Sequence, residues 1–191
     1  MTYLEVLTDI CSRVADPELD SYKERAKDHF LRAIAMKINA GEYTENDIPA
    51  FIKIKANVDF GSVGLIEDLN GLKIFKILSF FFPPGTDTDC IITFKEGEDL
   101  NRISALETLQ PTNNDLFIYR GGNTLYPVVG ASPVFTPGAD NISMKYIQDI
   151  DDSGWTDGTD LQAAASFQLT YTFMRTCIDI ASKTLLDEVN L

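Results

Sequence analysis

Histidine is nearly absent from this chain of 191 residues, which contains only His29. A catalytic triad needs a histidine base that works with two further groups, and multi-histidine metal sites need several imidazoles, so both are largely excluded. His29 falls inside a predicted helix, beside Phe30 and among charged residues. This setting indicates a solvated or helix-packing role rather than catalysis.

The glycine motifs of nucleotide and nucleophile sites are also missing. The sequence contains no G-x-x-x-x-G-K-[ST], no G-x-G-x-x-G after a predicted strand and no G-x-S-x-G. The sequence does not exclude a catalytic pair of carboxylates of the kind that glycosidases use. The nearest clusters are Glu67-Asp68 and the group Glu96, Glu98 and Asp99, which we expect in solvated turns. The sequence therefore predicts a protein that is not an enzyme.

Cysteine and long apolar runs are scarce. Cys11, Cys90 and Cys177 are far apart and form no C-x-x-C pair, so we interpret them as reduced thiols used as small apolar residues. The first residues show no basic segment followed by an apolar one, which predicts no signal peptide. The longest apolar patch, residues 77–84, is too short to span a bilayer. We expect synthesis in the cytosol and no membrane partner.

Negative charge is abundant instead. The formal net charge is −13 and the sequence pI is about 4.4. Such a chain repels phosphate backbones and anionic membrane surfaces, so ordinary nucleic-acid binding is disfavoured. An acidic protein can still work beside DNA where the DNA must pass without sticking.

Apolar spacing predicts helices over the first fifty residues. Apolar side chains recur at helical intervals up to Val14, and Asp16-Pro17 then breaks the pattern. A second helix is expected over residues 18–39, with Gly41 as its stop signal. Residues 44–47, Thr-Glu-Asn-Asp, match a capping box and predict a short helical turn.

Residues 51–150 have the character of a β region. Residues 52–59 alternate Ile-Lys-Ile-Lys-Ala-Asn-Val-Asp, the pattern of a half-buried strand. Residues 116–126, with glycines at Gly121 and Gly122, predict a hairpin. Further strands are expected at residues 72–82, 90–94 and 142–150, a turn at residues 83–85, and a short helix at residues 100–109.

The last segment contains no glycine or proline after Leu161. Residues 166–173 alternate like a strand, but the uninterrupted length and a possible cap at residues 158–160 favour one long helix. Apolar residues on more than one face of it predict a subunit interface. The residues assigned to that interface are Phe167, Leu169, Phe173, Met174, Ile178 and Leu185. The whole order predicts a single α+β domain over residues 1–191, with the N-terminal helices and the C-terminal helix packed together beside a mainly antiparallel β region.

One acidic segment has the oxygen spacing of an EF-hand calcium loop. Its twelve residues run from 149 to 160, with Gly154 at the turn position. The candidate ligands are Asp149, Asp151, Ser153, Trp155 through its carbonyl, Asp157 and Asp160. Asp160 is shorter than the usual glutamate, and Thr156 stands where an apolar residue normally pairs with a second hand. The alternative is an acidic turn that caps the following helix.

Three stretches together give the chain its likeness to a known family. They are Leu7 to Val14 with Asp16-Pro17, then residues 22–38 with Tyr43-Thr-Glu-Asn-Asp47, and last Trp155-Thr-Asp-Gly-Thr-Asp160 with the helix that ends Ala181-Ser-Lys-Thr-Leu-Leu186. With these, the chain resembles the head-to-tail connector, or adaptor ring, proteins of tailed double-stranded DNA bacteriophages. The likeness covers about two-fifths of the chain.

This resemblance implies a virion structural protein in a homo-oligomeric ring at the head-to-tail junction. The ring would extend the portal channel, contact the portal and tail proteins of the same virion, and let DNA pass without specific binding. It implies no cofactor. The alternative is a small acidic binding module, possibly holding calcium, that forms no ring.

Overall fold

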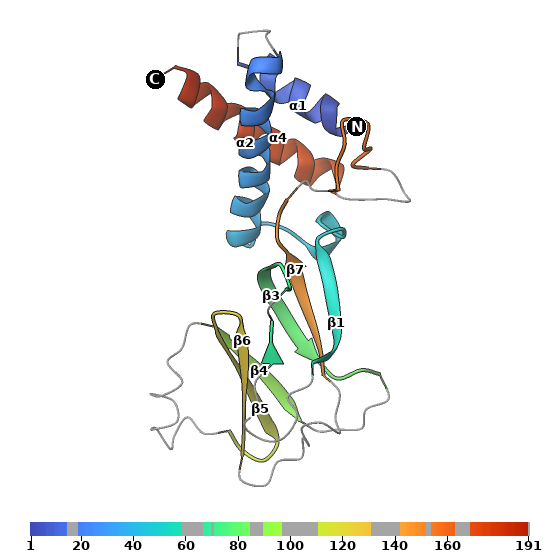
Figure 1. Cartoon of the computed structure of the whole chain (residues 1–191), viewed down its shortest axis with the longest axis vertical. Helices are drawn as coiled ribbons and strands as arrows, with labels where there is room; N and C mark the ends of the chain where they lie inside the picture. Colours follow the sequence, from blue (N-terminus) through green and yellow to red (C-terminus); the bar gives the residue numbers. More distant parts are fainter. Residues whose placement is uncertain are drawn as a thin grey trace. The chain divides into compact units, whose positions relative to one another are not determined.

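The structure is a computed structural model that describes residues 1–14, 19–58, 67–69, 71–84, 90–96, 111–130, 142–151, 154–162 and 169–190. In this described part, α-helices come from both ends of the chain and strands from its middle (Figure 1). The chain divides into two compact units. The helical unit is formed by Met1–Ile52 and Asp149–Leu191, and the β unit by Lys53–Gln148. The predicted α+β class is confirmed, and the prediction that the whole chain behaves as one domain stays a prediction.

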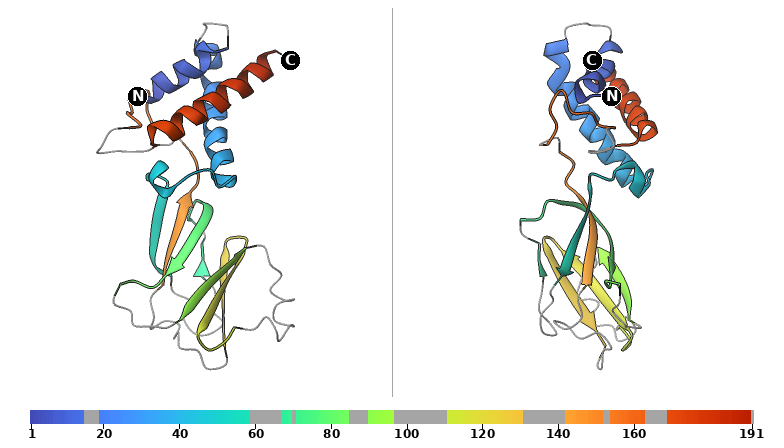
Figure 2. Two further views of the ribbon diagram at one scale, coloured as in Figure 1. Left: turned by 180° about the vertical axis from the view of Figure 1, so that it is seen from behind. Right: turned by 90° about the vertical axis from the view of Figure 1, so that its right-hand side faces the viewer.

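The helical unit brings the predicted helices together. Its elements are α1 (Tyr3–Ser12), α2 (Leu19–Asn39), the short 3₁₀ helix η1 (Glu45–Asp47) and α4 (Tyr171–Val189). Each of α1, α2 and α4 packs against the other two, and the views of Figure 2 agree on this. The core between them is apolar, with Ile10, Phe30, Ile34, Met174 and Ile178 all fully buried. Burial of such side chains contributes about 1.5–3 kcal/mol each.

Gly41 ends α2 as its sequence predicts. Its φ of +72° lies in the left-handed region that favours glycine. The Gly41 N–H donates to the carbonyl of Ile38 at 3.1 Å, and the Glu42 N–H donates to the carbonyl of Lys37 at 3.0 Å. These paired bonds form a Schellman motif, which satisfies carbonyls that the end of a helix would leave unpaired.

The start of α4 corrects the prediction of a helix from about residue 158. The helix begins at Tyr171, where the Thr170 side chain accepts a hydrogen bond from the Phe173 N–H at 3.4 Å. Asp160 instead forms an antiparallel bridge with Thr2. The backbone there is thus paired with the first residues of the chain and is not available to open a helix. Residues 171–173 are helical, and residues 163–168 lie outside the described residues.

Two sheets make up the β unit. The strands are β1 (Ile52–Val58), β2 (Glu67–Asp68), β3 (Ile74–Phe81), β4 (Ile91–Glu96), β5 (Asp115–Gly121), β6 (Thr124–Val129) and β7 (Ile142–Gln148). Among the described strands, one sheet has the order β1-β7-β3 and the other β2-β6-β5-β4. The pairs β3–β7, β5–β6 and β2–β6 are antiparallel, and β4–β5 is parallel.

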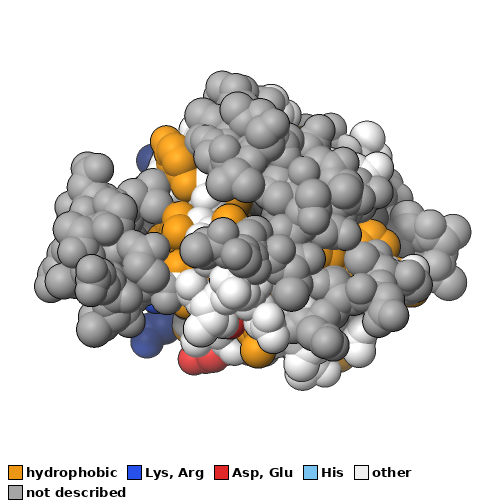
Figure 3. All heavy atoms as spheres, turned by 90° about the horizontal axis from the view of Figure 1, so that it is seen from below, with side chains coloured by type: hydrophobic (Ala, Val, Ile, Leu, Met, Phe, Trp, Pro, Cys, Tyr) orange, Lys and Arg blue, Asp and Glu red, His pale blue; other side chains and the backbone are white. Residues whose placement is uncertain are grey.

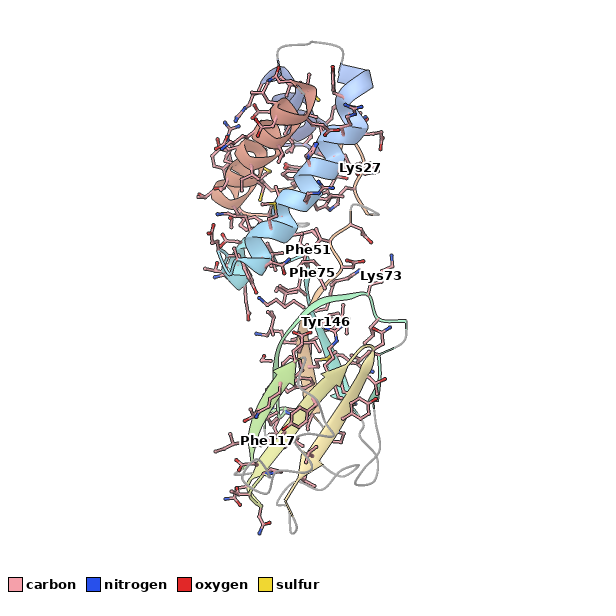
Figure 4. The ribbon with its side chains drawn as sticks, turned by 90° about the vertical axis from the view of Figure 1, so that its left-hand side faces the viewer. Lys27, Phe51, Lys73, Phe75, Phe117 and Tyr146 are labelled. Atoms are coloured by element: carbon pink, nitrogen blue, oxygen red, sulfur yellow. The ribbon has the colours of Figure 1, made fainter. Side chains whose placement is uncertain are left out.

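The inner faces of the two sheets share one apolar core. From the first sheet come Val58, Ile77, Phe80, Ile142, Met144 and Tyr146, and from the second sheet Leu116, Ile118 and Leu125. Figure 4 shows Tyr146 on β7 among the other side chains of the unit, in keeping with an exposure of 8%. Apolar side chains from facing sheets, interdigitated in this way, stabilise the packing of one sheet on another.

The predicted hairpin is confirmed. Strands β5 and β6 pair up to Gly121 and Thr124, so Gly122 and Asn123 form a two-residue turn. Gly122 has a φ of +61°, which tight hairpin turns require and which most residues adopt at a cost.

Strand β1 forms where predicted but does not keep the simple alternation of a half-buried strand. Ile54 is 59% exposed, whereas Val58, an even number of residues along, is buried. Between them Asn57 has a φ of +55°. A left-handed residue within a strand interrupts the period-2 pattern, as in a bulge, which accounts for the different exposure of the two side chains.

Several predicted features lie outside the described residues: the break at Asp16-Pro17, Gly85 of the 83–85 turn, and the helix over residues 100–109.

Candidate functional site

The segment predicted as a calcium loop holds the start of the chain in the helical unit. Trp155 packs against the ring of Tyr3 with centroids 5.2 Å apart and against that of Phe51 at 5.9 Å, both edge-on. The Tyr3 N–H donates to the carbonyl of Thr159 at 2.8 Å. Edge-to-face aromatic pairs add about 0.5–1.5 kcal/mol beyond their buried area. Trp155 is therefore a packing residue of the helical unit.

Two predicted calcium ligands already hold cations. Asp157 Oδ2 accepts from Lys23 Nζ at 2.8 Å, and Asp160 Oδ1 accepts from the Met1 ammonium at 3.1 Å. The hydrogen bond from the Gln162 N–H is the main cause that lowers the pKa of Asp160, and the Met1 ammonium lowers it further. These are the contacts of an acidic turn that binds the N-terminal segment.

Of the other proposed ligands, those that the structure describes belong to no cluster of metal-binding side chains. Asp149 is exposed and its Oδ1 accepts from the Ile150 N–H at 3.1 Å, Asp151 is half-buried, and Ser153 lies outside the described residues. Within the described ranges, no group of three or more His, Cys, Asp or Glu side chains is placed to hold a metal ion. Calcium binding stays a prediction, and an ion would have to compete with Lys23 and the ammonium.

His29 is a residue of α2, and its side chain reaches α4. Its Nε2 is 2.6 Å from Glu188 Oε2, and its side chain is 11% exposed. The His29 contact, and then nearby Arg25 and Arg32, lower the pKa of Glu188. The Nδ1 atom of His29 is buried and has no hydrogen-bond partner among the described residues. The contact with Glu188 is that of a helix-packing residue.

The cysteines have the environment of small apolar side chains. Cys11 and Cys177 are buried free thiols in the helical unit, and Cys90 packs against the core of the β unit. Burial raises the pKa of Cys177 to about 12 and raises that of Cys11 above its ordinary value. A thiol with so high a pKa supplies almost no thiolate at neutral pH, so Cys177 is unsuited to nucleophilic attack.

The carboxylate clusters are not arranged as predicted. Glu67 and Asp68 form strand β2, not a turn, and pair with Leu125 and Thr124 of β6. Glu96 ends β4, where its Oε1 accepts from Arg120 of β5 at 3.0 Å. Glu98 and Asp99 lie outside the described residues.

The subunit interface predicted on the last helix is corrected. Leu169, Met174, Ile178 and Leu185 have no exposed surface, and Phe173 is 5% exposed, because α1 and α2 both pack against α4. These side chains form the core of the helical unit and are not accessible to a neighbouring subunit. Phe167 lies outside the described residues. The large apolar side chains that α4 does expose are Tyr171, Leu186 and Val189.

Charged side chains also join α1 to α4. Arg13 donates to Asp9 at 3.0 Å and to Asp179 of α4, and Arg175 of α4 donates to Asp9. The carboxylate of Asp179, and then that of Asp9, raise the pKa of Arg13. Basic and acidic side chains alternate in this network, and it holds the two helices together.

A charge pattern that sequence reasoning missed occurs on the sheet β1-β7-β3. Its strands contain Lys53, Lys55, Lys76 and Lys145 and no acidic residue, in a chain of net charge −13. The exposed Ile54 lies between two of these lysines. The signal was present in the Ile-Lys-Ile-Lys repeat, but only the strand order shows that the four lysines belong to one sheet.

Two comparisons with known proteins return no match. No model of a known protein family matches the chain, and a search of curated proteins finds no significant match. Among the described helices, none is both long enough and apolar enough to cross a membrane. The function is therefore argued from the residues and their arrangement.

Proposed function

We propose that this chain is a structural protein of a tailed bacteriophage virion. It would form a homo-oligomeric ring at the head-to-tail junction that extends the portal channel, joins head to tail and lets the genome through. The proposal takes the connector-like resemblance of the sequence as its starting point.

One observation carries the proposal. The three stretches with the likeness to connector proteins come from opposite ends of the chain, and all of them fall in the helical unit, where α1, α2 and α4 pack together. The β unit is inserted between them as a separate compact unit. A resemblance arising by chance in unrelated segments would not be expected to collect in one folded unit.

Charge supports the same proposal. The helical unit contains eight basic and eighteen acidic residues, a net charge of −10. A wall of such subunits would repel DNA phosphates and let a genome slide past without binding. The described residues also lack a metal cluster, and their one histidine packs between helices, which suits assembly better than catalysis.

Native mass spectrometry and negative-stain electron microscopy of the purified chain would test the ring. We expect a closed oligomer of many copies with a central opening. A second experiment incubates the chain with portal rings, and the chain should then bind to one end of the portal. A chain that stays monomeric at every concentration and with portal present would refute the proposal.

The alternative of a small acidic binding module is favoured by one observation only, the calcium-like spacing of residues 149–160. Calorimetric titration with calcium separates the two. Saturable heat from a chain that remains monomeric would favour the binding module, whereas ring formation that is independent of calcium would favour the connector.

A further inference from the structure

We draw no further inference here: the strongest candidate, the apolar surface patch on the face of the β unit shown in Figure 3, carries nothing because no feature of the described residues shows what covers it.

Discussion

The hydroxyl of Thr170 donates a hydrogen bond of 2.6 Å to Asp47 Oδ1, and the Thr170 N–H donates to the Asp47 carbonyl at 3.0 Å. Asp47 Oδ2 accepts in addition from the N–H and the hydroxyl of Thr44, at 2.8 and 2.7 Å. Thr44 precedes η1 and Thr170 caps α4. One carboxylate therefore fixes the beginnings of two elements that are far apart in the sequence.

Replacing that carboxylate should destabilise the helical unit. Asp47→Asn puts an amide NH₂ where one acceptor oxygen was, so either Thr44 or Thr170 loses its acceptor. We expect the free energy of unfolding to fall by about 1.5–3 kcal/mol, the usual range for a hydrogen bond to a charged group. Urea denaturation measures it. Asp28→Asn, an exposed position on α2, is the matched control, and equal midpoints for the two variants would contradict the role of Asp47.

Acid should weaken the fold through the same group. Hydrogen bonds from Thr170, and then from Thr44, lower the pKa of Asp47. A carboxyl whose pKa is depressed in the folded state stabilises fully above its unfolded pKa of about 3.9 and loses that stabilisation as the pH falls through the folded value. Melting temperatures recorded from about pH 6 to about pH 2 should decline less steeply in Asp47→Asn than in the natural chain. Parallel curves would show that other carboxyls account for the decline.

Trp155 should be the most sensitive packing position of the segment 154–161. Trp155→Ala removes the ring that contacts Tyr3 and Phe51, and large-to-small changes of this kind cost about 3–5 kcal/mol when the site is buried. Since Trp155 is half-buried, we expect about 2–3 kcal/mol. Thermal denaturation followed by circular dichroism measures it, with the exposed Tyr171→Ala as control. A loss no larger than that of the control would mean that the aromatic contacts do not hold the segment.

Trp155 also tests the single-domain prediction, because it is the only tryptophan of the chain and lies in the helical unit. Its fluorescence follows the unfolding of that unit, and hydrogen exchange of peptides from β7 follows the β unit. Coincident transitions in urea are the expected result for one cooperative domain. Two separated midpoints would show that the units unfold independently.

Local signals in the sequence predicted most of the fold. The apolar stripes of α1 and α2, the stop at Gly41, the turn before Phe51 and the glycine hairpin at Gly122 depend on neighbouring residues, so the sequence predicts them well. The start of α4 was mispredicted because Asp160 is bound by Thr2 and Met1, contacts that span almost the whole chain. No pattern of neighbouring residues in the sequence indicates these long-range contacts.

The candidate sites were predicted less well than the fold. The apolar faces of α4 suggested a subunit contact, but burial by α1 and α2 explains Met174 and Ile178 without a second copy. An acidic segment with calcium spacing is chemically close to one that binds a lysine and an ammonium, and the difference lies in partners distant in sequence. The sequence left a solvated and a helix-packing role open for His29, and in the structure its side chain is 11% exposed and contacts Glu188 of α4.

The hairpin turn offers a test within the β unit. Gly122→Ala should reduce stability by about 1 kcal/mol, because its φ of +61° is unfavourable for a residue with a side chain. Gly154→Ala is the control, since a Cβ there meets no atom within 4 Å and its φ is not positive. Equal stabilities in urea would indicate that the turn relaxes to another conformation.

Calcium affinity should depend on Lys23 if the segment 149–160 binds the ion at all. Asp157 must leave Lys23 before it can coordinate a metal, so we expect a flat calorimetric trace for the natural chain at millimolar calcium. Lys23→Ala removes the competitor. Heat in the natural chain that Asp157→Asn abolishes would contradict this expectation and establish the calcium site.

The insertion of the β unit between residues 52 and 149 has a consequence for biosynthesis. A ribosome releases α1 and α2 first, then the complete β unit, and only later α4. The β unit has all its strands while the first two helices still lack the apolar face that covers them. A nascent chain thus passes through a stage in which α4 has not yet covered the apolar side chains of α2, such as Phe30 and Ile34. At that stage it exposes the most apolar surface to a chaperone.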